Sequence, residues 1–414
     1  MAYGRVGVCT QEFGGLAAWL VVALNAVTGN LDHEGGAMFP TPAADLVALA
    51  VRTGDRGHFG IWKSRVRGLP EFGGELPAAA MAEEIETEGQ GRIRALVTFA
   101  GNPVLSTPNG GRLDRALAGL EYMVSIDLYR NETTRHANLI LPTSFGFERD
   151  HYDLAFYLLS VRNAARYVQA LVPPPPGVRG DFEVLLDLAL AVRRHGGGRQ
   201  GRLRGLTLRA IRALGERRLL DLMLRLGPHK LSLRKLLQNP HGIDLGPLRP
   251  QLPGRLYTRD QRMQLAPEIF LRDLQRLEAS LAQPADGLVL IGRRALRSNN
   301  SWMHNSLRLV KGPAGCTLLI HPEDAAARGL SPGGRARVAS RVGTVEVPVQ
   351  ITSDVARGVV SLPHGWGHVR EGAELSVAAA HAGASLNDLT DDGAVDLLSG
   401  NAAFNGVPVT VGKA

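Results

Sequence analysis

The segment from Arg94 to Pro142 constrains the fold more than any other part of the chain. Residues 95–100 form an apolar run that ends at Gly101-Asn102-Pro103, helical spacing follows at residues 113–120, and residues 122–126 are apolar again. A third short run, 137–141, ends at Pro142. Strand, helix and strand in this order predict a parallel sheet, whose ligands bind beyond the carboxyl ends of the strands.

The last third of the chain has a different pattern. Beyond Pro284 short β-type runs alternate with turn signals, at residues 288–292, 316–320, 335–340, 344–351 and 358–362. Polar and apolar residues alternate on both sides of Arg341-Val342-Gly343, which predicts a hairpin. A compact β-barrel of about 130 residues accommodates these strands.

The remaining segments connect these two regions. An apolar helix is expected at residues 16–27, and residues 40–90 have no clear periodicity, which indicates an irregular covering segment. Pro173 to Gly177 marks a rigid break, after which residues 181–237 have helical spacing interrupted by Gly196-Gly197-Gly198, and a further helix is expected at 267–281. The fold class is therefore α/β with a helical continuation and a C-terminal barrel, in domains 1–150, 151–284 and 285–414.

Composition narrows the possible partners. The net charge of +8 would suit nucleic acid, but only 5 of 47 basic residues are Lys, and Arg equally suits the phosphates of an anionic cofactor. The chain lacks aromatic stacking platforms and a recognisable reading helix, which argues against nucleic acid. Two cysteines are too few for an iron–sulfur cluster held by this chain alone. The longest apolar run, 16–27, is too short to span a membrane.

Gly101 and Asp127 are the first candidate site residues. Gly101 would let backbone amides approach a pyrophosphate, and Asp127, at the end of the second strand, could bind a ribose hydroxyl or guanine donors. The alternative is an ordinary strand-end turn with a capping Asp.

Four strings together resemble the dimethyl sulfoxide reductase family of molybdopterin oxidoreductases. They are Gly7-x-Cys9-Thr10-Gln11-x-x-Gly14 with Leu24-Asn25-x-x-Thr28-Gly29-Asn30; Gly101-Asn102-Pro103 with Asp127 and Asn131-Glu132-Thr133-Thr134; Gly292 to Asn305; and Leu362 to His368 with Leu386-Asn387-Asp388. Asn138 stands where the family usually has Asp. The resemblance covers nearly the whole chain except the middle helical region.

The resemblance implies a molybdenum bis(molybdopterin guanine dinucleotide) cofactor and no metal ligand from this chain. The cofactor-binding residues that it implies are Thr10, Gln11, Gly101, Asn102, Pro103, Asp127, Thr133, Arg294, Ser298, Asn300, Ser301, His304, His364, Gly365 and Asn387. His364 and His368 have the i, i+4 spacing of helical metal ligands, but the intervening Gly365 and Gly367 favour a loop.

The family's catalytic metal ligand and its 4Fe-4S cluster would lie upstream of this chain, so Cys9 is expected to be a packed thiol. The chain is then expected to be a fragment, a product of a wrong start site or a split subunit, inactive without an N-terminal half. An electron-transfer partner and a cytoplasmic location are expected. The alternative is a non-catalytic module that binds a pterin dinucleotide or stabilises a partner. The substrate stays open.

Overall fold

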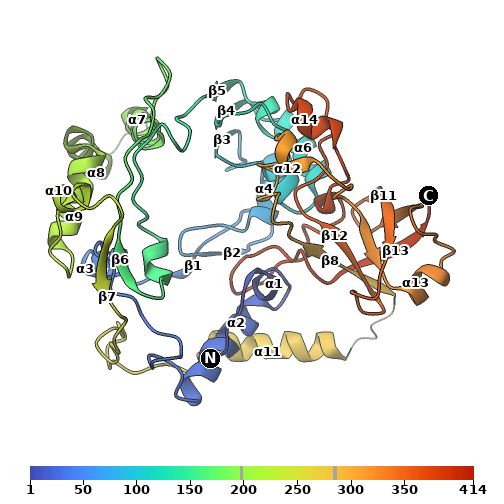
Figure 1. Cartoon of the computed structure of the whole chain (residues 1–414), viewed down its shortest axis with the longest axis horizontal. Coiled ribbons are helices and arrows are strands. Elements are labelled where there is room, and N and C mark those ends of the chain that lie inside the picture. The colour runs from blue at the N-terminus through green and yellow to red at the C-terminus, as the bar shows by residue number, and fades with distance from the viewer. Residues whose placement is uncertain (196–198, 283–286) are drawn as a thin grey trace. The chain divides into compact units, whose positions relative to one another are not determined.

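A computed structural model describes residues 1–195, 199–282 and 287–414 (Figure 1). The chain divides into two compact units that are discontinuous in sequence. One unit comprises Met1–Ala2, Val22–Gly57 and Pro142–Leu265, and the other comprises Tyr3–Val21, His58–Leu141 and Ala266–Ala414. The predicted boundary at residue 284 lies outside the described residues.

The second unit contains the predicted parallel sheet. Strands β3 (Ala95–Phe99), β4 (Tyr122–Ile126) and β5 (Leu139–Leu141) pair in that order, both pairs parallel. The connection from β3 to β4 carries α5 (Pro103–Ser106) and α6 (Gly110–Ala118), and η2 (Thr134–His136) precedes β5. The prediction of a βαβ unit followed by a third strand is confirmed.

The two faces of this sheet differ. One face packs on α4 (Met81–Glu86) and α6, through a core that includes Ile85, Leu113 and Met123. The residues that alternate with this core along the strands leave the other face open to solvent. Four of its side chains are 43–50% exposed, namely Val97, Phe99, Tyr122 and Leu139.

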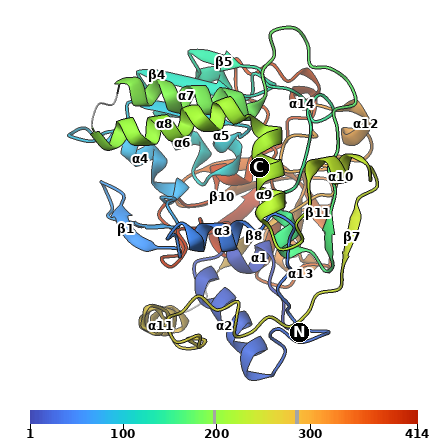
Figure 2. The same ribbon diagram turned by 90° about the vertical axis from the view of Figure 1, so that its left-hand side faces the viewer.

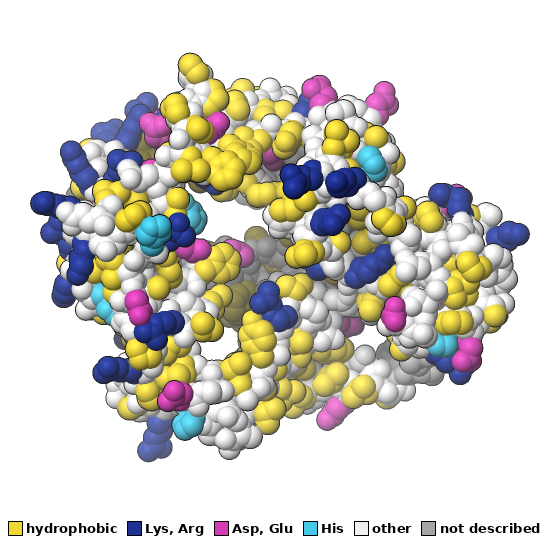
Figure 3. Space-filling model, in the orientation of Figure 1, with side chains coloured by type: hydrophobic (Ala, Val, Ile, Leu, Met, Phe, Trp, Pro, Cys, Tyr) yellow, Lys and Arg dark blue, Asp and Glu magenta, His cyan; other side chains and the backbone are white. Residues whose placement is uncertain are grey.

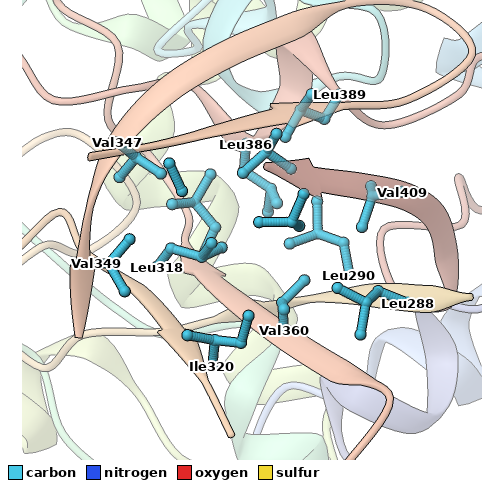
Figure 4. Packing of buried hydrophobic residues seen from close by; sticks show 14 of the residues in the cluster. Leu288, Leu290, Leu318, Ile320, Val347, Val349, Val360, Leu386, Leu389 and Val409 are labelled. Carbon is cyan, nitrogen blue, oxygen red and sulfur yellow. The ribbon is translucent and has the colours of Figure 1, made fainter. Parts of the chain in front are cut away.

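The C-terminal strands close into a six-stranded barrel, which confirms the predicted architecture. Its order is β10-β11-β9-β12-β8-β13, and β13 also pairs with β10. The strands are β8 (Leu288–Arg293), β9 (Leu318–Ile320), β10 (Arg335–Ala339), β11 (Thr344–Ile351), β12 (Val359–Pro363) and β13 (Val407–Lys413). Aliphatic side chains fill the interior, among them Leu290, Leu318 and Val360 (Figure 4).

Short helical segments join the barrel strands. They are α12 (Leu307–Val310), α13 (Pro322–Ala326), α14 (Ser376–Ala380) and η4 (Leu386–Asp388). Strands β10 and β11 form the predicted antiparallel hairpin around residues 341–343.

The expected helix at 16–27 is α2 (Gly14–Val27), which follows the short α1 (Val6–Cys9). Gly29 follows α2 with a φ of 71°, a left-handed conformation that suits glycine after a helix end. The predicted helix at 267–281 is α11 (Glu268–Leu281), and its Phe270 stacks on Trp19 with ring centroids 5.3 Å apart.

The expectation of an irregular segment at residues 40–90 is wrong. That segment forms α3 (Leu46–Arg52), β1 (Phe59–Lys63), β2 (Pro70–Phe72), η1 (Ala78–Ala80) and α4. The β1-β2 hairpin is stabilised by a buried side chain, which leaves no periodic pattern in the sequence. The buried Glu71 carboxylate accepts hydrogen bonds from the amides of Ile61 and Gly74, at 3.0 and 2.9 Å.

The first unit is mainly helical, as predicted for residues 181–237. It contains η3 (Phe156–Leu159), β6 (Asn163–Ala165), α7 (Asp181–His195), α8 (Arg199–Leu214), α9 (Glu216–Leu226), α10 (Leu233–Leu237) and β7 (Ile243–Gly246). Helices α7 and α8 lie side by side (Figure 2). The hydrophobic core of this unit includes Leu224, Leu236 and Tyr167. The predicted interruption at Gly196–Gly198 lies outside the described residues. In the described part of the chain, no helix has both the length and the apolar character needed to cross a membrane.

Candidate functional site

The turn that follows β3 is the first element of the candidate site. Ala100 has a φ of +47°, an uncommon conformation for a residue with a side chain. A Cβ added to Gly101 would meet no atom closer than 3.6 Å. The packing of this chain therefore does not itself require glycine at position 101.

Both polar atoms of the side chain of Asn102, the next residue, form hydrogen bonds. Its Oδ1 accepts a hydrogen bond from Thr133 Oγ1 at 2.7 Å, and its Nδ2 donates to Glu132 Oε2 at 2.7 Å. Thr133 Oγ1 in turn accepts from the Val104 amide at 3.0 Å. These contacts fasten the start of α5 to the segment that precedes η2, and Glu132 and Thr133 are fully buried.

Asp127 lies directly after β4, as predicted, and is partly buried. Its Oδ1 accepts from the amides of Leu128 and Tyr129 at 2.6 and 3.3 Å, and its Oδ2 accepts from Asn131 Nδ2 at 3.2 Å. Burial raises the pKa of the Asp127 carboxyl, although these three donors act in the opposite direction. The carboxylate stabilises the turn in which it lies, and Oδ2 accepts only one of these three bonds.

The loop after β8 carries exposed positive charge. Between residues 294 and 311 there is no Asp or Glu, and four basic side chains are exposed: Arg294, Arg297, Arg308 and Lys311. Within the described ranges no acidic side chain forms an ion pair with them. Figure 3 shows dark blue side chains gathered over α12 in this part of the unit. Although the Arg294 side chain is exposed as a whole, partial burial of its guanidinium lowers the pKa of Arg294. The guanidinium contacts Asn300 Oδ1.

The loop after β12 lies against the loop after β8. Gly365 has a φ of +91°, and a Cβ there would lie 2.1 Å from the carbonyl oxygen of Asn300 and 3.1 Å from the Ser301 amide nitrogen. Glycine is therefore required at position 365 by the close approach of two backbones. The residues from His364 to His368 are not helical, which confirms the expected loop.

The two histidines of this loop point to different partners. His364 packs edge-on against Phe404, with ring centroids 6.2 Å apart. Burial, and then the charge of Arg294, lower the pKa of His364 to about 4. His368 is buried and its Nδ1 lies 2.7 Å from Glu132 Oε1.

A buried row of polar side chains joins the sheet to both barrel loops. From Glu132 it continues through His368 to His304, whose Nδ1 lies 2.9 Å from His368 Nε2. His304 Nε2 lies 2.8 Å from Ser298 Oγ. The His304 ring stacks on Trp366 with centroids 4.0 Å apart. We call Glu132, His368, His304 and Ser298 the polar row.

Asn387 and Thr10 tie other segments to the barrel. The buried Asn387 donates from Nδ2 to the Leu105 carbonyl at 2.7 Å and accepts from Thr390 Oγ1 at 2.9 Å. Thr10 Oγ1 accepts from Asn405 Nδ2 at 2.9 Å. Gln11 donates to the Val8 carbonyl at 3.1 Å and lines a cavity of about 410 Å³.

The structure thus brings together part of the predicted set. Asn102, Thr133, Ser298 and His304 are linked through the polar row, and Gly365 touches Asn300 and Ser301. No direct contact joins Asp127, Gln11 or Asn387 to the polar row among the described side chains. Pro103 begins α5 beside Asn102.

Sequence reasoning did not assign three residues of this region to the site: Glu132, Trp366, and His368, which was considered only for its spacing from His364. Glu132 and His368 stand inside the recognised strings, but their pairing joins positions 236 residues apart and becomes visible only in the fold.

Two buried polar atoms beside these loops lack a hydrogen-bond partner within the described residues, Trp366 Nε1 and Ser385 Oγ. A Cβ on Gly367 would lie 2.6 Å from the Ser385 Cβ, so the two loops meet here. Buried donors and acceptors are normally paired. Unpaired polar atoms and a basic segment without ion-pair partners among the described residues are features expected of residues that hold a polar, anionic cofactor.

Comparison with known protein families agrees with this geometry. Residues 1–191 match the family model described as Molybdopterin oxidoreductase, and residues 288–408 match the Molydopterin dinucleotide binding domain. The chain belongs to the molybdopterin oxidoreductases of the dimethyl sulfoxide reductase family. The second match covers five of the six barrel strands, the first two residues of β13, and the loops after β8 and β12.

Several characterised relatives are longer than this chain. It is 26% identical over 297 residues to the NADPH-Fe(3+) oxidoreductase subunit alpha of Geobacter sulfurreducens, which covers 70% of this chain and 30% of the relative. It is 22% identical over 409 residues to the dimethyl sulfoxide/trimethylamine N-oxide reductase of Rhodobacter capsulatus, covering 86% and 47%. Identity reaches 32% over 120 residues with the assimilatory nitrate reductase catalytic subunit of Bacillus subtilis, covering 28% and 16%.

A solved structure shows the same fold. The acetylene hydratase from Pelobacter acetylenicus superposes with a TM-score of 0.61 at 16% sequence identity, covering 82% of this chain and 46% of that one. The matched part of this chain therefore covers less than half of each of these four proteins.

Proposed function

We propose that this chain supplies the second half of the cofactor-binding region of a molybdenum bis(molybdopterin guanine dinucleotide) oxidoreductase. The observation that carries this proposal is the arrangement of the basic segment 294–311, the turn at Gly101 and the loop at Gly365 within one compact unit. When bound, such a cofactor supplies oxygen-atom or electron transfer at its metal. The residues of this chain would bind and orient it.

In this proposal seven of the predicted residues have a stated physical role. Arg294 would pair with a phosphate, since a guanidinium matches phosphate oxygens with two parallel donors. Ser298, Asn300 and Ser301 would offer neutral donors and acceptors to a pterin. His304, whose two ring nitrogens contact His368 and Ser298, would act on the pterin through Ser298. The Gly101 backbone would contact pyrophosphate, and Asp127 Oδ2 would accept from the guanine end.

The metal ligand and the 4Fe-4S cluster would come from residues that correspond to the N-terminal part of the relatives, on the same polypeptide or on a partner. The match of this chain to less than half of each relative supports this division of roles. The uncovered face of the β3-β4-β5 sheet also supports it, because parallel sheets are normally covered on both faces.

Cofactor content tests the binding role. We expect Arg294→Ala with Arg297→Ala to lower the molybdenum and guanine content of the purified protein, because a lost charged hydrogen bond typically costs about 1.5–3 kcal/mol, or about 10- to 100-fold in affinity. Arg337→Ala, an exposed arginine on β10 of the same barrel, is the matched control. Equal cofactor content in all three proteins would contradict the assignment of the basic segment.

Activity tests the division of roles. We expect the chain alone to show no dye-linked reductase or dehydrogenase turnover and no iron–sulfur absorbance, and to gain both when combined with the N-terminal part. Turnover by the chain alone at the level of an intact enzyme would refute the division. Stoichiometric cofactor without turnover in the combined protein would instead indicate a non-catalytic binding module.

A further inference from the structure

Three residues next to Glu132, the first member of the polar row, can form their hydrogen bonds in one direction only. The Val104 amide can only donate, so Thr133 Oγ1 accepts from it and gives its own hydrogen to Asn102 Oδ1. Asn102 must then donate from Nδ2 to Glu132 Oε2. A backbone amide thereby fixes the orientation of the Asn102 side chain and aims its donor at the carboxylate.

Glu132 is ionised at neutral pH in this environment. Burial by itself would raise the pKa of Glu132, but the hydrogen bonds and charge of His368, with the donor of Asn102, together lower it. An ionised carboxylate only accepts hydrogen bonds, so His368 Nδ1 carries a hydrogen. Glu132 therefore determines the tautomer of His368.

The rest of the row follows from this tautomer. When His368 is neutral its Nε2 has only a lone pair, so His304 must donate to it from Nδ1, across 2.9 Å. Neutral His304 then has a lone pair at Nε2 and accepts the Ser298 hydroxyl hydrogen across 2.8 Å. In this state Ser298 Oγ can only accept from any further group.

Addition of one proton reverses every bond beyond Glu132. A proton arrives at Ser298 Oγ from water or a bound acid, Ser298 passes its own proton to His304 Nε2, and His304 passes its Nδ1 proton to His368 Nε2. One O–H bond and two N–H bonds form, while the donor's bond to the incoming proton, the former Ser298 O–H bond and the His304 Nδ1–H bond break. No electrons are transferred, and His368 becomes an imidazolium paired with Glu132. Ser298 then presents a donor.

We propose that Ser298, His304, His368 and Glu132 form a proton relay that stores one proton beside Glu132 and switches Ser298 from acceptor to donor. Glu132 and His368 are positioning residues in this relay, since they act on the loop only through His304. The relay itself rests on the contacts described above. Its use in selecting the protonation state of a bound pterin rests on the proposed function.

The surroundings explain where the charge resides. The titratable groups that act on His304 are His368, Glu132 and His364, and the neutral Trp366 ring stacks on it. Burial first, and then His368, lower the pKa of His304 to about 4. Glu132 Oε1 lies 2.7 Å from His368 Nδ1 and is the counter-charge for the added proton, so the relay places that proton on His368 and His304 only passes it on.

Nuclear magnetic resonance of the full chain labelled with [¹⁵N]histidine tests the relay without cofactor or activity. We expect His304 at pH 8 to carry its hydrogen on Nδ1 and its lone pair on Nε2. On acidification, protonation of His368 and transfer of the His304 hydrogen to Nε2 should occur in one step. Loss of signals in His304→Gln and His368→Gln assigns the resonances. An Nε2–H tautomer of His304 at pH 8, or two separate steps, would overturn the proposal.

Glu132→Gln tests the role of the carboxylate. The step should move at least one pH unit lower, a tenfold loss of proton affinity, because the stored charge loses its partner. His364→Gln, which alters a buried histidine outside the row, should leave the His304 tautomer unchanged. An unmoved step in Glu132→Gln would refute the relay.

Ser298→Ala tests the relay at the end of the polar row opposite Glu132, and it can be measured even if Glu132→Gln does not fold. The protonated state needs an acceptor for His304 Nε2–H, so the step should again move to lower pH. Cofactor content does not enter either measurement, so failure of the relay is distinguishable from failure of the proposed function.

Discussion

The Asp127 carboxylate stabilises the turn in which it lies, and in the proposed function it also binds the guanine end of the cofactor. Substitution can separate these two roles. We expect Asp127→Asn to keep an oxygen for the amides of Leu128 and Tyr129 while it removes the charge. Loss of a charged acceptor typically costs about 1.5–3 kcal/mol, so retention of the guanine dinucleotide should fall about 10- to 100-fold. Molybdenum and guanine per protein are the measured quantities, with a circular dichroism spectrum to verify the fold.

Asp127→Ala completes this pair of variants because it removes the turn bonds as well as the charge. If Asp127→Asn retains full cofactor and only Asp127→Ala loses it, the residue is a turn residue and not a ligand.

His364 makes stability depend on pH. Burial lowers the pKa of His364 to about 4, whereas an exposed histidine of an unfolded chain titrates near 6.5. Between these values the unfolded state binds more protons than the folded state. The contribution of neutral His364 is therefore complete above about pH 6.5 and is lost as pH falls toward 4.

We expect the melting temperature of His364→Gln to fall less than that of the wild type between pH 7.5 and pH 4.5. His381→Gln, which alters an exposed histidine, is the control. If the melting temperatures of wild type and His364→Gln change in parallel with pH, burial of the His364 ring does not determine how stability depends on pH.

The site illustrates which residues a sequence can identify. The strand-end position of Asp127 and the loop at His364 were predicted, because both follow directly from local strand and glycine patterns. Glu132 was missed as a site residue, since a carboxylate is exposed by default and only the fold provides His368 and Asn102 as partners. Asn387 was predicted as a pterin contact, and its side chain also ties η4 to α5. Its contact with a pterin stays a prediction.

At the scale of elements, the open face of the β3-β4-β5 sheet has a measurable consequence. Phe99 and Leu139 are 44% and 43% exposed on strands that are normally covered. We expect the purified chain to self-associate through this face or to bind a partner there. Phe99→Ser with Leu139→Thr should reduce association in sedimentation velocity experiments.

Leu296→Ser is the control for this prediction, because Leu296 is 98% exposed in a loop outside the sheet. A monodisperse wild-type monomer, or association that the double variant leaves unchanged, would argue against the sheet face as an interface.

The elements that sequence patterns missed lack a clear apolar period, for different reasons. Strand β13 contains Pro408, which cannot donate to a ladder and so weakens the signal of a strand. In the hairpin β1-β2, the buried Glu71 holds the turn through backbone amides that no periodicity reveals. Long strands and helices with regular apolar spacing were predicted because burial of one face leaves a period in the sequence.

At the scale of the whole molecule, two units with separate cores should unfold in separable steps. Leu224 in the first unit and Leu290 in the second are both fully buried. Leu→Ala at either position should cost about 2–5 kcal/mol. We expect Leu224→Ala to lower one calorimetric transition and Leu290→Ala to lower the other. A single transition that both variants shift equally would show that the units unfold together.

The N-terminus of α2 depends on distant parts of the chain. The Gly15 amide donates to Asp396 Oδ2 at 3.0 Å, and these two residues are 381 positions apart. A ribosome that adds about 5–20 residues per second needs on the order of 20–75 s to cover that distance. For that interval the start of the second unit has been made but its capping carboxylate has not. Throughout that interval the Gly15 amide can be paired only with water or another group, so the start of α2 reaches its native contacts late in synthesis.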